Sequence, residues 1–338
     1  MVEIPVALIG CGRIGRMHAE NIASHPKLKL AAVHDAHGPS AEKIASDFEV
    51  RSCAEAEEIF SDSAIKAVLV ASTTDTHTEY IERSVAAGKP VLCEKPIDLD
   101  IARVNQCAKN ISGSDVPVQI GFNRRFDPGH AAASNAARSG EIGELRQVFI
   151  TSRDPEMPPE AYYFSAGGLL RDMTIHDFDL ARFFLVDEPV EVFAIGGRLI
   201  DPDFMNELDD HDTAMIIMRT EDGKQCHINN FRLATYGYDQ RVELVGSGGM
   251  VISGNRKPHE LQRFSGNRTE SSEPYLYFFI ERYTEAFAAE LSEFANCIES
   301  GNTPSPGFED GRRALLLAEA AYRSIAERRL VRVDEVVE

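Results

Sequence analysis

The chain has 338 residues, more than one hydrophobic core usually holds, so we expect two domains. Hydrophobic residues make up 43% of the sequence and charged residues 26%, which is typical of a folded globular protein rather than a disordered one. A net charge of −19 repels nucleic acid phosphates and anionic lipid, and no segment approaches the ~20 apolar residues that cross a bilayer. We therefore expect neither nucleic acid nor a membrane as a partner.

The six cysteines are scattered along the sequence and include no C-x-x-C pair. This usage is typical of reduced, buried thiols in a cytosolic protein and argues against a metal site built on cysteine. The N-terminal residues lack the basic segment and longer apolar stretch of a signal peptide. The sequence therefore predicts a cytoplasmic protein without a bound metal.

The first 120 residues alternate between short apolar runs and helix-compatible stretches, a pattern typical of β-α-β units and a parallel sheet. The runs are rich in Val, Ile and Leu, as expected of strands covered by helices on both faces. The predicted strands are 4–9, 28–33, 67–71, 90–93 and 116–120, and the predicted helices are 14–24, 40–48, 54–60, 76–87 and 99–110. Residues 1–122 are thus predicted to form a doubly wound α/β domain of the Rossmann type.

The pattern changes after residue 122. Several strands follow one another without intervening helices, which indicates an open, mainly antiparallel sheet. The predicted strands are 145–153, 190–200, 213–220, 225–233, 240–245 and 250–253, and the predicted helices are 128–139, 174–185, 275–300 and 311–328. Residues 123–338 are predicted to form an α+β domain for substrate binding and oligomerisation, whose last helix packs back on the first domain.

The segment after the first predicted strand reads G-C-G-R-I-G, which matches the dinucleotide-binding pattern G-x-G-x-x-G. Gly10 allows the tight turn, Gly12 leaves room for a pyrophosphate, and Gly15 lets helix and strand pack closely. The amides of Arg13 and Ile14 open the helix and would face the pyrophosphate. The alternative interpretation is a glycine turn without a ligand.

An acidic residue, Asp35, ends the second predicted strand 20 residues after Gly15, where the ribose-binding acid of such folds belongs. Its carboxylate would accept hydrogen bonds from both ribose hydroxyls and repel a 2′-phosphate. Residues 36–38 contain no arginine to neutralise that phosphate. The predicted cofactor is therefore NAD rather than NADP.

Polar residues follow the predicted strand 67–71, at the sheet edge where ligands bind in open α/β folds. Ser72, Thr73 and His77 are predicted to line the cofactor. Alternatively, Asp75 in the same run simply caps the next helix.

The sequence Glu94-Lys95-Pro96 follows the next predicted strand, at the same sheet edge. A lysine beside a bound nicotinamide can donate to a reacting hydroxyl and stabilise negative charge on its oxygen. Glu94 and Lys95 are predicted cofactor contacts. The alternative is a surface ion pair between neighbouring charges.

A second polar group contains Asp172 and His176, which share one helical face if a single helix includes both. A histidine held by a carboxylate is suited to remove a hydroxyl proton near neutral pH. The alternatives are a helix cap at Asp172 with an ordinary histidine, and a metal site built from His176 and the nearby acids. The acids of segment 209–212 are interpreted as a solvated turn rather than a metal site.

These motifs together resemble those of the Gfo/Idh/MocA oxidoreductase family, over essentially the whole chain. The strings G-F-N-R-R-F-D at 121–127 and Y-G-Y-D-Q-R at 236–241 resemble, more narrowly, those of its inositol dehydrogenases. The resemblance implies Lys95, Asp172 and His176 as the catalytic set, and a homotetramer assembled through the open face of the second sheet. The implied substrate contacts are these three residues together with Asn123, Arg125, Asp154 and Tyr236.

The implied reaction is the NAD-dependent oxidation of a secondary hydroxyl of a cyclic polyol, such as myo-inositol to 2-keto-myo-inositol, or of scyllo-inositol. Segment 153–159 matches the inositol enzymes only loosely, and loops of this kind set specificity. An NAD(P)-dependent dehydrogenase of aldoses or deoxy-sugars is therefore an alternative. A non-catalytic dinucleotide-sensing regulator is another, because one fold can host many functions.

Overall fold

The computed structural model describes residues 3–336 and divides them into two compact units. The N-terminal unit comprises residues 3–123 and 285–315, and the C-terminal unit comprises residues 124–284 and 316–336. The outer ends of the two predicted domains, at residues 1–2 and 337–338, lie outside the described residues.

The N-terminal unit contains a parallel sheet that, within the described residues, has six strands in the order β3-β2-β1-β4-β5-β6. This is the strand order of a doubly wound dinucleotide-binding fold, as predicted. Strands β4 and β6 are buried along their whole length, and β1 and β5 at all but one residue each, which explains why they read as continuous apolar runs. The strands are β1 (Ile4–Ile9), β2 (Leu28–His34), β3 (Arg51–Cys53), β4 (Ala67–Val70), β5 (Val91–Glu94) and β6 (Val118–Gly121).

Helices of the N-terminal unit pack on this sheet in two groups. Helices α1, α2 and α12 share a hydrophobic core with β1, β2, β4 and β5, whereas α4 packs on α5, β4 and β5. Helix α12 enters this core through Leu291 and Phe294, although it lies far along the chain. The helices are α1 (Arg13–Ser24), α2 (Gly38–Phe48), α3 (Glu57–Ser61), η1 (Thr74–Thr76), α4 (His77–Ala86), α5 (Ile101–Asn110), α12 (Thr284–Ser300) and the first part of α13 (Phe308–Glu327).

The C-terminal unit contains a second sheet, with strand order β12-β11-β7-β10-β9-β8-β15 in the part of the chain that the structure describes. Among the strands of residues 3–336, only β7 and β10 of this sheet pair in parallel, so the sheet is mainly antiparallel, as predicted. Buried and exposed residues alternate along β9, because one face is covered and the other is open. The strands are β7 (Leu145–Arg153), β8 (Pro189–Gly197), β9 (Thr213–Thr220), β10 (Gln225–Phe231), β11 (Asp239–Gly246), β12 (Met250–Ser253) and β15 (Val331–Arg332).

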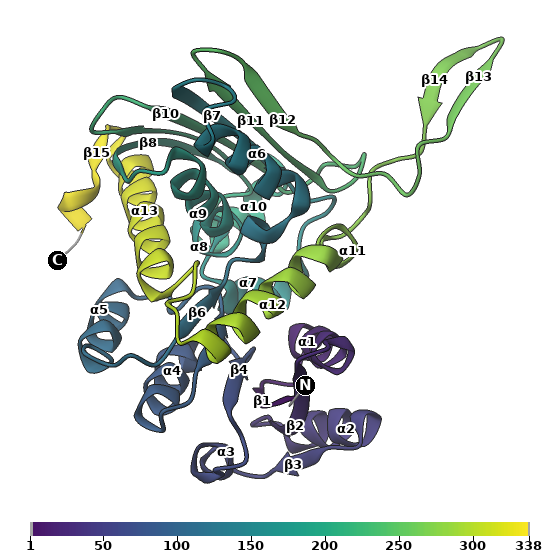
Figure 1. The fold of residues 1–338 in the computed structure, drawn as a ribbon. Helices are drawn as coiled ribbons and strands as arrows, with labels where there is room; N and C mark the ends of the chain where they lie inside the picture. The colour runs from purple at the N-terminus through teal and green to yellow at the C-terminus, as the bar shows by residue number, and fades with distance from the viewer. Residues whose placement is uncertain (1–2, 337–338) are drawn as a thin grey trace. The chain divides into compact units, whose positions relative to one another are not determined.

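Helices of the C-terminal unit cover one face of the second sheet (Figure 1). Helix α6 contacts β11 and β12, α9 contacts β7 and β10, and Ser324 near the end of α13 accepts a hydrogen bond from the amide of Ala194 in β8. The helices are η2 (Asn123–Phe126), α6 (Pro128–Arg138), α7 (Glu160–Ala166), α8 (Leu169–Asp172), α9 (Thr174–Leu185), α10 (Pro202–Glu207), α11 (Phe279–Arg282) and η3 (Val333–Val336).

The structure differs from the predicted elements mainly in short segments. The predicted helix 275–300 is two helices, α11 and α12, and the exposed stretch after residue 260 forms a hairpin of β13 (Gln262–Ser265) and β14 (Arg268–Ser272). This hairpin extends away from the second sheet in Figure 1. Elements of two to seven residues, such as β3, α7, α8, α10 and β15, have too few residues to show a period in the sequence.

The interpretation of segment 209–212 as a solvated turn is wrong for two of its acids. Asp212 is fully buried and accepts hydrogen bonds from the amides of Leu199, Ile200 and Asp201. Asp210 is buried and accepts from the amide of Leu169. These buried carboxylates satisfy backbone donors of nearby loop and helix-start residues.

Candidate active site

The glycine loop between β1 and α1 has the shape that a dinucleotide requires. Gly10 has a φ of +97°, and a Cβ there would lie 2.4 Å from the backbone of Ala71. A Cβ on Gly15 would lie 1.9 Å from the carbonyl oxygen of Gly10, whereas a Cβ on Gly12 would meet no described atom within 4 Å. Gly10 and Gly15 therefore let the loop pack closely against its neighbours, whereas Gly12 leaves open space at the start of the helix.

That open space faces the start of α1. Gly12 is the N-cap, and no side chain among the described residues caps the helix there. The first turn of α1, which begins at Arg13, lies at the end of the helix where the dipole is positive and an anion is stabilised. These features fit the pyrophosphate of a dinucleotide.

Asp35 lies beside this loop. Its carboxylate accepts a hydrogen bond of 2.6 Å from the amide of Cys11 and one of 2.7 Å from the amide of His37. The side chain is thereby fixed at the end of β2 and remains partly exposed. This is a suitable position for a carboxylate that accepts from ribose hydroxyls.

The segment after β4 is organised by His77 rather than by Asp75. The ring of His77 is buried, with Nδ1 2.8 Å from the carbonyl oxygen of Pro96 and Nε2 3.1 Å from that of Ser72. Burial lowers the pKa of His77, although both carbonyls raise it. Asp75 caps neither η1 nor α4.

His77 therefore connects the segment after β4 with the one after β5, because its two ring nitrogens face carbonyls of the two segments. This supports a positioning role for His77 rather than direct contact with the cofactor. Ser72 and Thr73 remain predicted cofactor contacts. The Ser72 hydroxyl is already hydrogen-bonded to Thr76 at 2.7 Å.

The segment Glu94-Lys95-Pro96 follows β5 directly. The Glu94 carboxylate is 2.7 Å from Nε2 of His18, on α1, and its other oxygen is 3.3 Å from the amide of Lys95. Burial raises the pKa of Glu94, but the hydrogen bond from His18 together with the charges of His18, Lys95 and His77 outweighs this and leaves the pKa below its ordinary value. Glu94 thus has a long-range partner on α1 in addition to the neighbouring Lys95.

In the C-terminal unit, Asp172 is held by two side chains distant in sequence. It accepts hydrogen bonds of 2.8 Å from the hydroxyl of Tyr162 and 2.8 Å from the guanidinium of Arg232. Arg232 is fully buried, and its other side is 3.9 Å from Asp154. Because Asp172 is the last residue of α8, the alternative of an N-cap is wrong.

His176 lies one turn after Asp172, in α9. Met173 joins α8 to α9 and keeps a helical backbone, with φ −90° and ψ −55°. The chain therefore turns nearly as one helix through both residues, which supports the predicted shared face.

The arginine pair of the G-F-N-R-R-F-D string is engaged by carboxylates of α9. Arg124 donates to Asp177 at 2.7 Å, and Arg125 donates to Asp179 through two bonds of 2.8 and 2.5 Å. Both ion pairs are buried. The two arginines thus link η2 to α9 through ion pairs. A role of Arg125 in substrate binding stays a prediction.

The remaining predicted substrate contacts differ in their surroundings. Asn123 is 3% exposed, and its Nδ2 has no hydrogen-bond partner among residues 3–336, so it can donate to a ligand. Tyr236 is 46% exposed, and its hydroxyl donates to Asp239 and accepts from Arg153. Tyr236 also lines a hollow of about 520 Å³, together with Pro258, Glu273, Tyr275 and Glu281.

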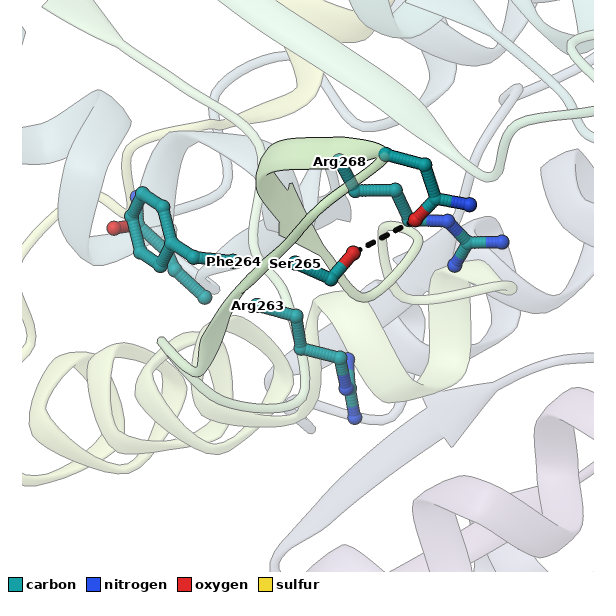
Figure 2. Close-up of a pocket in the computed structure, with 6 residues that line it drawn as sticks. Arg263, Phe264, Ser265 and Arg268 are labelled. Atoms are coloured by element: carbon teal, nitrogen blue, oxygen red, sulfur yellow. Dashed lines mark hydrogen bonds between the residues drawn. The ribbon is translucent and has the colours of Figure 1, made fainter.

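Another hollow lies on the β13–β14 hairpin. Figure 2 shows its side chains, including Phe264 and Arg268, and the hydrogen bond from Ser265 to Asn267. Its lining, residues 262–265, 267 and 268, contains no predicted site residue among those the structure describes. We therefore assign no part of the chemistry to it.

Sequence reasoning missed His18 and Arg232, which hold two of the predicted site carboxylates. Neither residue belongs to a motif, and each is distant in sequence from its partner, by 76 and 60 residues. A prediction that a buried cation lies near the catalytic acid would have pointed to Arg232. The sequence does not show, however, whether a single isolated arginine is buried.

Within residues 3–336, no three His, Cys, Asp or Glu side chains gather in a way that could hold a metal ion. None of the helices in that range is both long and apolar enough to span a bilayer. All six cysteines lie in that range and are buried free thiols, as predicted.

Comparison with known families matches both parts of the chain. Residues 4–122 match the model of the Gfo/Idh/MocA oxidoreductase family with an NAD-binding Rossmann fold. Residues 130–252 match the model of the Gfo/Idh/MocA C-terminal domain.

Individual relatives match over nearly their full length. The chain is 46% identical to an inositol 2-dehydrogenase of Rhizobium meliloti, over 98% of this chain and 100% of the relative. It is 38% identical to a myo-inositol 2-dehydrogenase of Thermotoga maritima, over 98% and 99% of the two chains.

Solved structures agree with the fold. A putative myo-inositol dehydrogenase from Sinorhizobium meliloti superposes with a TM-score of 0.94, at 44% identity, over 98% of this chain and 99% of that one. A scyllo-inositol dehydrogenase from Lactobacillus casei, with bound NAD(H) and scyllo-inositol, superposes with a TM-score of 0.89, at 28% identity and the same coverage.

These likenesses and the glycine loop agree on the fold, the cofactor and the class of chemistry. The predicted fold class, NAD as cofactor and oxidoreductase activity are confirmed. The chain belongs to the Gfo/Idh/MocA oxidoreductase family, and its NAD-binding domain is the doubly wound part of the N-terminal unit.

Proposed function

We propose that this protein is an inositol 2-dehydrogenase, which oxidises a secondary hydroxyl of myo-inositol, or of scyllo-inositol, with NAD. The substrate assignment rests on the 46% identity to an inositol 2-dehydrogenase, over 98% of this chain and 100% of the relative. The Arg232-held pair of acids, Asp154 and Asp172, supports a polar substrate, because carboxylates accept hydrogen bonds from several hydroxyls at once.

In this proposal, Lys95, Asp172 and His176 act on one substrate hydroxyl. His176 removes the hydroxyl proton as a general base, and the carbon–oxygen bond becomes a carbonyl as hydride leaves the same carbon. NAD, when bound, accepts that hydride. Lys95 donates to the substrate oxygen and stabilises the negative charge that develops on it.

Asp172 orients His176 in this scheme. Its two hydrogen-bond partners, Tyr162 and Arg232, support that role, since they restrict the carboxylate to one position. Asn123, Arg125, Asp154 and Tyr236 are proposed to contact the remaining hydroxyls.

The test is reduction of NAD, followed by absorbance, with myo-inositol, scyllo-inositol and glucose, using NAD and NADP in parallel. We expect turnover with an inositol and NAD, and loss of turnover in Lys95→Ala and His176→Ala while NAD still binds. Activity on glucose with none on inositols would favour a sugar dehydrogenase instead. Tight NAD binding without turnover on any polyol or sugar would favour a regulator, and retained activity in both variants would refute the assigned roles.

We also propose that the protein works in the cytoplasm as a homotetramer built through the open face of the second sheet. Strand register places Phe193, Ile217, His227, Phe149, Glu243 and Ile252 in one row across that face. Ile217 is 55% and Ile252 56% exposed, and exposed apolar side chains gathered on one face mark association surfaces. Light scattering should give a tetramer for the wild type and a smaller species for Ile217→Glu, whereas an unchanged mass would contradict this surface.

A further inference from the structure

The backbone around Lys95 is held from both sides by buried histidines of the N-terminal unit. Before Lys95, the carboxylate of Glu94 is 2.7 Å from the ring of His18, which is 0% exposed. After Lys95, the carbonyl of Pro96 is 2.8 Å from the ring of His77. Lys95 therefore lies in a segment whose position depends on two rings contributed by other elements, α1 and α4.

A second carboxyl lies behind this segment. Glu290, in α12, is 0% exposed, and neither of its carboxyl oxygens has a hydrogen-bond partner among the described residues. The side chain of Gln119, in β6, donates instead to the backbone carbonyl of Glu290, at 3.1 Å. Burial and the charge of Glu94 raise the pKa of Glu290 well above its ordinary value.

The two acids of this region differ in their partners. Glu94 in β5 faces His18 from α1 and also experiences the charges of Lys95 and His77, whereas Glu290 in α12 has no hydrogen-bond partner for either carboxyl oxygen among the described residues, and the neighbouring Gln119 is neutral. An ionised carboxylate without partners is very costly in a protein interior, and two nearby carboxylates disfavour ionisation of the second. Glu94, which has His18 as partner, is the favoured site of the negative charge.

We propose that His18, Glu94 and Glu290 form a buried positioning network for Lys95, in which Glu290 keeps its proton and His18 with Glu94 fixes the backbone of the lysine. Direct contact with substrate or cofactor is not required of His18 or Glu290. The kinetic part of this proposal rests on the proposed dehydrogenase function, because the position of Lys95 matters only if it acts on a substrate oxygen.

The proton on Glu290 is tested without any turnover. Glu290→Gln replaces a neutral acid by a neutral amide of the same shape, and melting temperatures of both proteins are measured from about pH 5 to pH 8. A group whose pKa is higher in the folded chain than in the unfolded one makes stability fall as pH rises. We therefore expect the variant to gain melting temperature relative to the wild type across this range. Parallel curves would show that Glu290 holds no such proton and would overturn the proposal.

The positioning role is tested with His18→Gln and with the control His25→Gln. His25 caps the end of α1 and hydrogen-bonds to Ser292, away from the lysine segment. In His18→Gln we expect kcat to fall by about 10- to 100-fold, since misplacing a catalytic group by about 1 Å has an effect of this order. NAD affinity, measured by calorimetry, should fall less than kcat, because the glycine loop keeps its shape even though Glu94 and Lys95 are also predicted cofactor contacts.

Two further readouts separate positioning from general damage. The primary isotope effect with substrate deuterated at the reacting carbon should rise in His18→Gln and stay at the wild-type value in His25→Gln. Glu94→Gln combined with His18→Gln should lose little more than either single variant, because both break the same contact. A kcat equal to that of the wild type in His18→Gln, or fully additive losses, would refute the role. A wild type that turns over no polyol would refute the proposed function, while the melting curves would still decide the state of Glu290.

Discussion

Different forces maintain two regions of the molecule: the glycine loop in the N-terminal unit, and the acid cluster around Arg232 in the C-terminal unit. In the loop, backbone atoms approach so closely that a single Cβ at Gly15 would overlap the carbonyl of Gly10. In the cluster, Asp154 and Asp172 converge on one buried guanidinium. Steric fit therefore maintains the first region and charge balance the second, and the two should respond differently to substitution.

The largest effect is expected where charge balance is removed. Arg232→Met keeps the apolar part of the side chain but leaves Asp154 and Asp172 without their shared cation. Breaking a buried ion pair costs about 3–5 kcal/mol of unfolding free energy, which denaturant titration measures. Turnover should be lost as well, because Asp172 is no longer held in place.

The matched control is Arg51→Met. Arg51 pairs with Asp62 at 2.7 Å, but its side chain is 46% exposed, so the loss should be below about 1 kcal/mol. Adding Asp172→Asn to Arg232→Met should recover part of the stability, because it removes one of the unpaired charges. Equal losses in the two arginine variants would mean that charge balance does not maintain the cluster.

The next largest effect is steric, and a comparison of alanine substitutions at two glycines of one loop measures it. Gly15→Ala should cost about 3 kcal/mol of stability and abolish NAD binding, because helix α1 must move away from β1. Gly12→Ala meets no described atom within 4 Å, so it should lose no more than about 1 kcal/mol while still weakening NAD binding. Thermal melting and NAD calorimetry together distinguish the cases, and normal NAD affinity in Gly12→Ala would contradict the proposed pyrophosphate position.

The smallest effect is expected at Asp35, where both the shape and the charge of the side chain matter. Asp35→Asn keeps the shape of the side chain but removes the charge that two amides and the ribose hydroxyls contact. The expected loss of NAD affinity is roughly 10-fold, the low end for a hydrogen bond to a charged group. Discrimination against NADP should weaken, because the 2′-phosphate is no longer repelled. Unchanged preference between the cofactors, measured by calorimetry with each, would place selectivity elsewhere.

Much of the fold and the glycine loop of the candidate site were predictable from local patterns. The parallel sheet followed from short apolar runs alternating with helices, and the roles of Gly10, Gly12 and Gly15 follow from spacing alone. These features are local, because a turn or a helix start depends on residues that are neighbours in the chain. Short elements such as α7 and α10 were missed because they are too short to display a period.

The sequence by itself therefore determined the doubly wound fold, the glycine loop and the acid at Asp35, since each depends on contacts between nearby residues or on the repeated pattern of strands and helices. Only the tertiary structure decided which partners hold the functional carboxylates: Arg232 for Asp172, His18 for Glu94, and none among the described side chains for Glu290. The physical reason is that desolvation and ion pairing depend on which side chains folding brings together, and those side chains lie 60 or more residues apart.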